Sequence, residues 1–88
     1  MDYEKIIHTL VDDIVDNKEI MISQMPSENP KEVLLMIFSD PEDTARLIGR
    51  KGIIADALRE VMSIAGKTEN KRIILKFESF DQIEKDED

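Results

Sequence analysis

The chain has 88 residues, enough for one small domain with a modest core but not for a deep, enclosed active site. It contains no cysteine, which excludes disulfide bonds and thiolate metal sites and favours a reducing, cytoplasmic compartment. No apolar run approaches the length of a signal or transmembrane segment, so no membrane partner is expected. The formal net charge of −8 argues, at first sight, against nucleic acid as a partner.

The first half of the chain predicts one helix followed by two strands. From Tyr3 to Val15 the apolar residues recur at three-and-four spacing, which is typical of a helix with one buried face. The segment Glu19–Met25 is short, rich in Ile and Met, and stops at Pro26, which indicates an edge strand. The continuous apolar run Val33–Phe38 is too short for an ordinary helix. It predicts a strand that is covered on both sides or paired on both edges.

The second half of the chain predicts two helices that meet at a pair of glycines. Asp40 is well placed as an N-cap and Pro41 as the first helical residue, and this short helix is expected to end at Gly49. A longer helix is predicted from about Ile53 to Ala65, with Gly66 as its stop. One face of this helix, expected to be buried, contains Ile54, Ala57, Leu58, Val61, Met62 and Ala65.

The segment Arg72–Phe80 alternates apolar and polar residues and predicts a third strand. Residues 81–88 are acidic and non-periodic, so we predict a single domain over 1–80 followed by a disordered acidic tail. The first two strands can pair antiparallel across the loop at 26–30. The last two strands can pair in parallel through the intervening helices. The sequence therefore predicts an α+β fold, helix-strand-strand-helix-helix-strand, in which three helices pack on one face of a three-stranded mixed sheet.

The charges are unevenly distributed along the chain. Between Ala45 and Arg72 lie seven of the twelve Lys and Arg residues but only three of the twenty Asp and Glu residues. The remaining positions are strongly acidic. An acidic molecule with one basic segment is compatible with a polyanionic partner, so this asymmetry outweighs the net charge.

Two glycines bracket an Arg-Lys pair, Gly49-Arg50-Lys51-Gly52, between the two predicted helices. Each glycine costs a helix about 1 kcal/mol relative to alanine, and glycine permits turn conformations and close approach of another backbone. The turn opens into a helix N-terminus, whose free N–H groups and dipole attract anions. These features predict a phosphate-binding clamp with apolar surfaces for bases at Ile48 and at Ile53 or Ile54. Because Ile48 and Ile54 also fit the core pattern, Ile53 is expected to be the exposed one.

A structural interpretation stays open for the basic residues. The bracketed pair could form a helix–helix turn with two solvated cations, although its position in the basic segment favours binding. Arg46 and Arg59 lie at least one helical turn from the loop. Each could reach a phosphate, or could pair with Asp43 or Asp56 at helical spacing.

The stretch LIGRKGIIADALREV resembles the I-G-x-x-G signature of the KH domain, whose loop clamps about four nucleotides of single-stranded nucleic acid. The predicted element order matches the type II, or bacterial, form of that fold. Over about residues 3–80 the chain resembles small stand-alone bacterial KH proteins of the KhpA type. The resemblance implies a cytoplasmic, often homodimeric protein that binds single-stranded RNA as an RNA chaperone or post-transcriptional regulator. It also implies association with a larger KH-containing protein of the Jag (KhpB) type in cell elongation and division.

Two positions depart from the family pattern. Relatives commonly carry a basic residue directly after the second glycine and another three positions later, whereas this chain has Ile53 and Asp56. Fewer charges predict weaker contact with RNA, micromolar or weaker for one copy, with a gain in avidity when two copies engage one RNA. Together, the residues and the resemblance place the RNA-binding site at Arg46, Ile48, Gly49, Arg50, Lys51, Gly52, Ile53 and Arg59.

No catalytic site, metal site or cofactor is predicted. His8 is the only histidine and has no second ligand in the pattern, and no Ser/His/Asp or Cys/His set is available for nucleophilic catalysis. The chain is therefore predicted to be a non-catalytic protein that binds single-stranded RNA. The alternative is an interaction module that dimerises or docks on a larger KH-containing partner, with weak or absent RNA binding. The net charge, Ile53 and the acidic tail favour that alternative.

Overall fold

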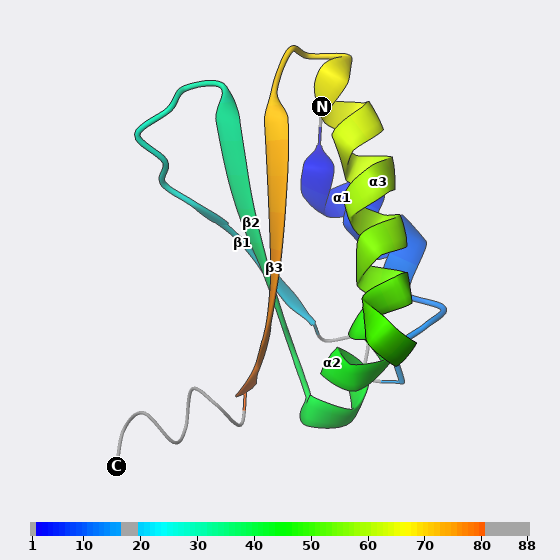
Figure 1. Ribbon diagram of the computed structural model, residues 1–88. Helices are drawn as coiled ribbons and strands as arrows, with labels where there is room; N and C mark the ends of the chain where they lie inside the picture. Colours follow the sequence, from blue (N-terminus) through cyan, green and yellow to red (C-terminus); the bar gives the residue numbers. More distant parts are fainter. Residues whose placement is uncertain (1, 17–19, 81–88) are drawn as a thin grey trace.

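The computed structural model describes residues 2–16 and 20–80 (Figure 1). The predicted tail at 81–88 and the predicted start of the first strand at Glu19 lie outside these residues. The order of helices and strands is the predicted one. In chain order the elements are α1 (Tyr3–Val11), β1 (Met21–Met25), β2 (Glu32–Ser39), α2 (Pro41–Ile48), the 3₁₀ turn η1 (Arg50–Gly52), α3 (Ile53–Lys67) and β3 (Arg72–Ser79).

The three strands form one mixed sheet in the order β1-β2-β3. β1 pairs antiparallel with β2, and β3 pairs in parallel with β2. β1 is therefore an edge strand, as predicted, and β2 is the strand paired on both edges. Every second residue of β2 is buried, because α1, α2 and α3 lie on the same face of the sheet (Figure 1). The prediction of an α+β fold with three helices on one face is confirmed.

The core lies between this sheet face and the three helices. Ile7 of α1, Leu47 of α2 and Met62 of α3 are fully buried in one cluster with Leu35 and Ile37 of β2. Helices this short gain most of their stability from such packing of an apolar face and not from intrinsic propensity. The core therefore fixes the positions of α2 and α3, and with them the turn that joins the two helices.

A polar contact also ties α1 to the turn between α3 and β3. The Tyr3 hydroxyl donates a hydrogen bond to a carboxylate oxygen of Glu69. Burial of the Tyr3 ring, together with this acidic partner, raises the pKa of Tyr3 to about 12. The same hydrogen bond lowers the pKa of Glu69. The Glu69 carboxylate is therefore directed towards α1.

The predicted C-terminus of the first helix is wrong by one turn. α1 ends at Val11 and not at Val15, and the chain then turns with the Ile14 N–H bonded to the Val11 carbonyl at 2.8 Å. Val15 is nevertheless buried. The apolar spacing therefore indicated which residues are buried, and it did not indicate where the helix ends. Burial continues to Val15, beyond the last residue of α1.

The prediction that Gly66 stops the longer helix is also wrong. α3 continues through Gly66 to Lys67, and Asn70, with φ at +57°, is the left-handed residue that reverses the chain. The N–H groups of Asn70 and Lys71 bond to the carbonyls of Lys67 and Gly66 at 3.2 and 2.8 Å, which is a Schellman motif. A Cβ at Gly66 would lie 2.5 Å from the Lys71 carbonyl oxygen. Glycine therefore serves close packing at this position, and asparagine ends the helix.

Candidate nucleic-acid interface

The glycine-bracketed stretch forms a tight, exposed turn between α2 and α3. α2 ends where the Gly49 N–H bonds to the Ala45 carbonyl at 2.9 Å, and the Gly52 N–H closes the turn onto the Gly49 carbonyl at 3.1 Å. Gly49, Lys51 and Gly52 have positive φ angles of 76°, 57° and 78°. α2 and α3 are thus two separate helices, as predicted, and not one continuous helix.

The two glycines are required for different reasons. Gly49 has φ +76° and ψ 176°, a conformation that is essentially restricted to glycine. A Cβ at Gly49 would also overlap Cγ1 of Ile54. A Cβ at Gly52 would meet no other atom within 4 Å, and only the left-handed backbone favours glycine there. The turn therefore packs tightly against α3 at its start and is open to another molecule at its end.

Arg50 and Lys51 project from this turn and are exposed. Neither takes part in an ion pair within the part of the chain that the structure describes. Gly52 is the N-cap of α3 and has no side chain to bond the first N–H groups of the helix, of which only that of Ile53 bonds back to the turn, at the Arg50 carbonyl. Two full positive charges, free N–H groups and the positive end of the helix dipole therefore meet at one exposed point, an arrangement that suits a phosphate.

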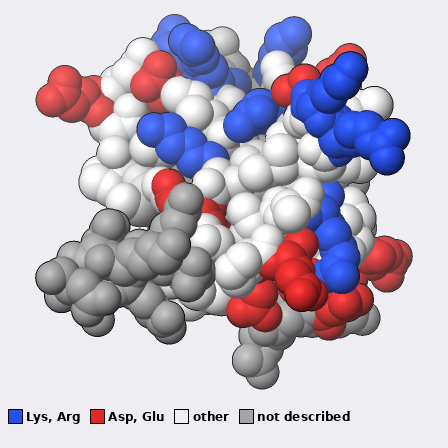
Figure 2. Space-filling view, turned by 60° about the horizontal axis from the view of Figure 1, so that its bottom comes forward, with Lys and Arg blue, Asp and Glu red and all other residues white. Residues whose placement is uncertain are grey.

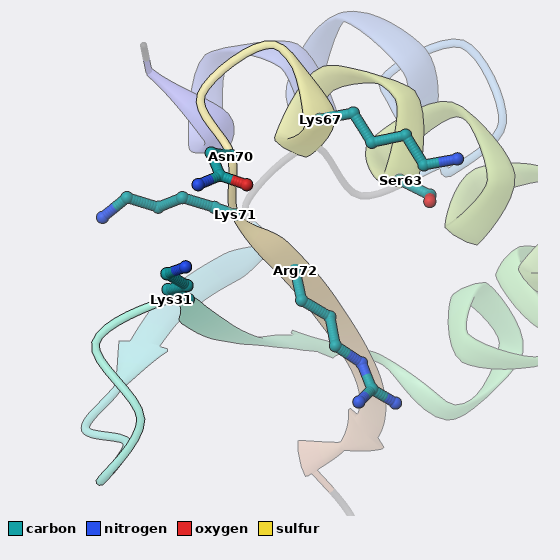
Figure 3. Close-up of a pocket in the computed structure, with 6 residues that line it drawn as sticks. All are labelled: Lys31, Ser63, Lys67, Asn70, Lys71 and Arg72. Carbon is teal, nitrogen blue, oxygen red and sulfur yellow. The ribbon is translucent and has the colours of Figure 1, made fainter.

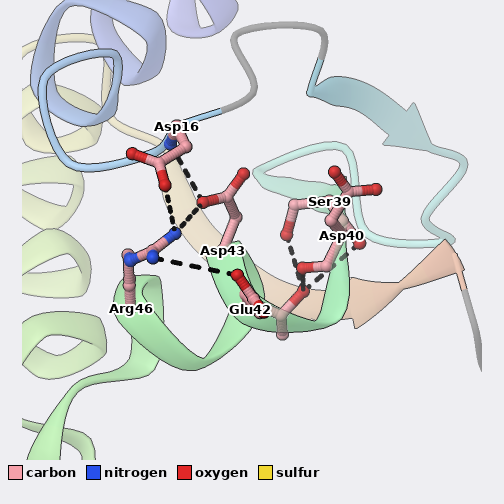
Figure 4. Close-up of polar contacts among 7 residues, drawn as sticks. Asp16, Ser39, Asp40, Glu42, Asp43 and Arg46 are labelled. Atoms are coloured by element: carbon pink, nitrogen blue, oxygen red, sulfur yellow. Dashed lines mark hydrogen bonds and ion pairs between the residues drawn. The ribbon is translucent and has the colours of Figure 1, made fainter.

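Arg46 is engaged by three carboxylates (Figure 4). Its Nη1 lies 2.7 Å from Asp43 Oδ1 and 3.2 Å from Asp16 Oδ2, and its Nη2 lies 3.9 Å from Glu42 Oε2. The hydrogen bond to Asp43, with the neighbouring acidic charges, raises the pKa of Arg46. Asp43 is buried and also accepts a hydrogen bond from the backbone N–H of Asp16. Arg46 therefore fastens α2 to the segment after α1. Contact of Arg46 with a phosphate stays a prediction. The guanidinium would have to leave one of its carboxylate partners to bind that phosphate.

Arg59 lies between α3 and β3. Its Nη1 is 3.5 Å from Asp56 Oδ1, its Nη2 donates a hydrogen bond to the Leu75 carbonyl at 3.4 Å, and its guanidinium lies 5.4 Å from the centre of the Phe77 ring. The ion pair with Asp56 is the structural alternative that the helical spacing suggested. The guanidinium remains half-exposed, so phosphate contact by Arg59 also stays a prediction.

Apolar side chains flank the turn. The exposed fraction of Ile53 is 65% and that of Ile48 is 37%, whereas Ile54 packs partly buried against the core. The prediction that Ile53 is the most exposed of the three is confirmed. Ile48 and Ile53 thus provide apolar surface on both sides of the Arg-Lys pair.

The predicted buried face of α3 is partly wrong. Val61 and Ala57 are exposed, and the fully buried residues of this helix are Ala55, Leu58, Met62 and Gly66. Val61 is 40% exposed and Ile64, which the sequence pattern did not single out, is 61% exposed. We refer to Ile53, Val61 and Ile64 as the apolar row of α3. The signal for it was present in the sequence, because α3 has more apolar residues than one face can bury.

Charged side chains are segregated on the surface of the molecule. Lys and Arg side chains gather in the upper part of the face shown in Figure 2, whereas the largest group of Asp and Glu side chains lies along its lower edge. The charge asymmetry of the sequence is therefore also an asymmetry in space. Such a distribution guides a polyanion towards one part of an acidic molecule.

His8, the one histidine of the sequence, lies in α1. His8 pairs with Asp12 at 3.1 Å on the same helix. No group of three or more His, Asp or Glu side chains in residues 2–16 and 20–80 is arranged to hold a metal ion. Over the same residues, no helix combines the length and apolar character needed to cross a bilayer.

A three-stranded mixed sheet, three helices on one of its faces and a G-x-x-G turn between the second and third helices define a type II KH domain. The family model for the KH domain of KhpA and KhpB matches residues 4–77. The chain therefore belongs to the KhpA/KhpB KH-domain family.

Curated relatives agree with this assignment. The chain is 32% identical to an RNA-binding protein KhpA from Clostridium acetobutylicum over 73 residues, which cover 82% of this chain and 95% of the relative. It is 31% identical to an RNA-binding protein KhpA from Aquifex aeolicus over 71 residues, which cover 80% of this chain and 87% of the relative. A KhpA from Clostridium perfringens is 27% identical over 82% of this chain and 95% of the relative. No solved structure gives a significant match to the chain.

Proposed function

We propose that this protein is a non-catalytic, cytoplasmic protein that binds single-stranded RNA across the turn at Gly49–Gly52. The observation that carries the proposal is the exposed Arg50–Lys51 pair, which has no ion-pair partner in the described chain and stands at the N-terminus of α3. Relatives that carry the name RNA-binding protein KhpA support it. We further propose, from the resemblance of the sequence to small bacterial KH proteins, a role as an RNA chaperone or post-transcriptional regulator linked to bacterial cell elongation and division.

The geometry suggests how the strand is held. Backbone N–H groups at the start of α3 donate to a phosphate, and the open side of Gly52 allows the sugar-phosphate chain to approach closely. Arg50 and Lys51 add charge-assisted contacts to neighbouring phosphates. Ile48 and Ile53 provide apolar surface for bases. Most of the affinity in this arrangement comes from the backbone, so little discrimination between sequences is expected from the turn itself.

The dependence of RNA affinity on salt tests this mode of binding. If two to four phosphates are neutralised, the logarithmic affinity falls with the logarithm of salt concentration at a slope of about −1.4 to −2.8. Between 50 and 200 mM salt the dissociation constant is then expected to rise about seven-fold to fifty-fold. Fluorescence anisotropy with a labelled oligouridylate measures this slope. A slope near zero would contradict backbone binding.

A second candidate function is supported by the apolar row of α3. Ile53, Val61 and Ile64 are more exposed than expected for large apolar side chains in a small domain, and all three lie on one helix. Exposed apolar surface of this kind marks a site of protein association. We propose that α3 forms a homodimer, or docks on a larger KH-containing protein of the Jag (KhpB) type.

Replacement of two members of the row tests self-association. In the double variant V61D/I64D, sedimentation velocity is expected to show a monomer at protein concentrations where the wild type is dimeric, because each new carboxylate would have to be desolvated at the interface. The matched control is M21D, which places one carboxylate on an equally open apolar side chain of β1. A dimer that persists in V61D/I64D and dissociates in M21D would assign the interface to the sheet and not to α3.

A further inference from the structure

A second basic site lies at the end of α3 that is remote from the turn. It is a hollow of about 340 Å³, which we call the distal hollow (Figure 3). α3 has 15 residues, so with a rise of 1.5 Å per residue the hollow lies about 20 Å from the Arg50–Lys51 pair. The residues that line the distal hollow are Lys31, Ser63, Lys67, Asn70, Lys71 and Arg72.

Two segments that are far apart in the sequence build this hollow, the start of β2 and the stretch 63–72. The backbone N–H of Arg72 bonds to the carbonyl of Lys31 at 2.7 Å, which places the start of β3 beside the start of β2. The Schellman motif at Asn70 turns the chain so that Lys71 returns to the end of α3. In Figure 3, the Lys67 side chain runs back along α3 towards Ser63, and the Arg72 side chain extends along β3. Four cationic side chains thereby line the distal hollow, and those of Lys67 and Lys71 extend in opposite directions in Figure 3.

The positive charge of the distal hollow is poorly compensated. No ion pair involves Lys31, Lys67 or Lys71 among residues 2–16 and 20–80, and the one ion pair of Arg72 is a 3.9 Å contact with Glu32. A second carboxylate, that of Glu69, accepts a hydrogen bond from Tyr3, and the charge of Lys71 contributes to lowering its pKa. Ser63 and Asn70 add neutral hydrogen-bond donors. Repulsion among these three lysines and the weakly paired Arg72 favours a bound polyanion, since such a partner relieves the repulsion.

A row of donors connects the distal hollow to the turn. Arg59, Ser63 and Lys67 are spaced by four residues and therefore lie along one side of α3. The contacts of Arg59 with Leu75 and Phe77 show that this is the side next to β3. A strand that crosses the turn and continues along this side of α3 first passes Asp56, whose carboxylate is paired with Arg59 at 3.5 Å, and then meets Arg59, Ser63 and Lys67. A compact anion such as a free nucleotide could not span both ends.

We propose that the distal hollow binds the backbone phosphates of the same RNA strand that crosses the Gly49–Gly52 turn, so that α3 is contacted at both of its ends. This inference depends on the proposed RNA-binding function and extends it. The turn alone accommodates about four nucleotides, as in other KH domains. The distal hollow lengthens the binding site and makes affinity depend on the length of the RNA.

The test compares two oligouridylates, one of four and one of twelve nucleotides, in fluorescence anisotropy titrations. The distal variant is K67Q/K71Q, the turn variant is R50D/K51D, and the matched control is K5Q/K76Q, which neutralises two exposed lysines outside both sites. K67Q/K71Q is expected to weaken binding of the twelve-nucleotide RNA roughly tenfold and to reduce its salt slope by about 1.4, because two phosphate contacts are lost. Its affinity for the four-nucleotide RNA, and that of K5Q/K76Q for both RNAs, should stay within about twofold of wild type.

Other outcomes overturn the proposal and identify what failed. If K67Q/K71Q binds the long RNA like wild type while R50D/K51D does not, the distal hollow is not an RNA site but the proposed function stands. An equal loss for both RNA lengths would show a general electrostatic effect and also overturn it. If wild type binds neither RNA, the proposed function itself fails. A twelve-residue oligoglutamate that competes as well as the RNA would overturn the assignment of the hollow to nucleic acid.

Discussion

Replacement of Arg50 and Lys51 by aspartate is expected to abolish the retardation of single-stranded RNA in native gels, with an affinity loss of at least about a hundredfold. Two cations that contact phosphate would become two anions at the N-terminus of α3, so lost attraction is compounded by repulsion. Both side chains are exposed and lack ion-pair partners in the described chain, so the fold should not depend on them. The circular dichroism spectrum and melting temperature of R50D/K51D should therefore match those of wild type.

The matched control for this experiment is the double variant K5D/K76D. It makes the same change in net charge at two exposed lysines, one on α1 and one on β3, that lie outside the turn. Its RNA affinity should fall only slightly, through the weaker overall field. An equal loss of affinity in both double variants would attribute binding to net charge alone. An unchanged affinity in R50D/K51D would remove the turn from the site.

The second large effect concerns stability and is expected at Gly49. G49A should lower the free energy of unfolding by about 2 to 4 kcal/mol, because alanine is strained in that conformation and its Cβ would overlap the Ile54 side chain. G52A should lower it by only about 1 kcal/mol, because only the left-handed backbone opposes alanine there. Urea denaturation followed by circular dichroism measures both values. Equal losses would show that contact with Ile54 does not constrain the turn.

The substitution that costs less stability, G52A, is expected to affect RNA binding directly. G52A adds a methyl group on the open side of the turn, where the sugar-phosphate chain is proposed to approach. It is therefore expected to weaken RNA binding even though the domain stays folded. This contrast separates the packing role of the first glycine from the binding role of the second.

The turn could be predicted from the sequence because its determinants are local. Two glycines, an adjacent helix start and an N-cap position at Asp40, whose side chain makes no capping hydrogen bond, lie within one short stretch. The fold followed from the order of the elements and from the short apolar run of β2, which could only be a strand. Where local signals competed, the prediction was wrong. The sequence predicted that Gly66 ends the helix. Gly66 instead packs so closely against β3 that a side chain would not fit, and Asn70 is the residue with a left-handed backbone that ends the helix.

The remaining features depend on contacts between distant segments. Arg46 pairs with Asp43 on its own helix, as the spacing allowed, but its contact with Asp16 arises only when α2 packs beside the end of α1. The distal hollow likewise requires Lys31 to meet Arg72 through the parallel pairing of β2 and β3. Helical periodicity also placed Val61 in the core. It could not show that Met62 and Leu58 already fill the space beneath α3.

Ile53 has a consequence for regulation, because it belongs both to the apolar surface beside the turn and to the apolar row of α3. One side chain cannot be covered by a nucleotide base and by a neighbouring polypeptide at the same time. If both proposed surfaces are used, the two events are antagonistic, and by thermodynamic reciprocity each weakens the other by the same factor. Dilution of the protein would then increase its apparent affinity for RNA, because fewer copies are held in assemblies, and saturating RNA would drive assemblies apart.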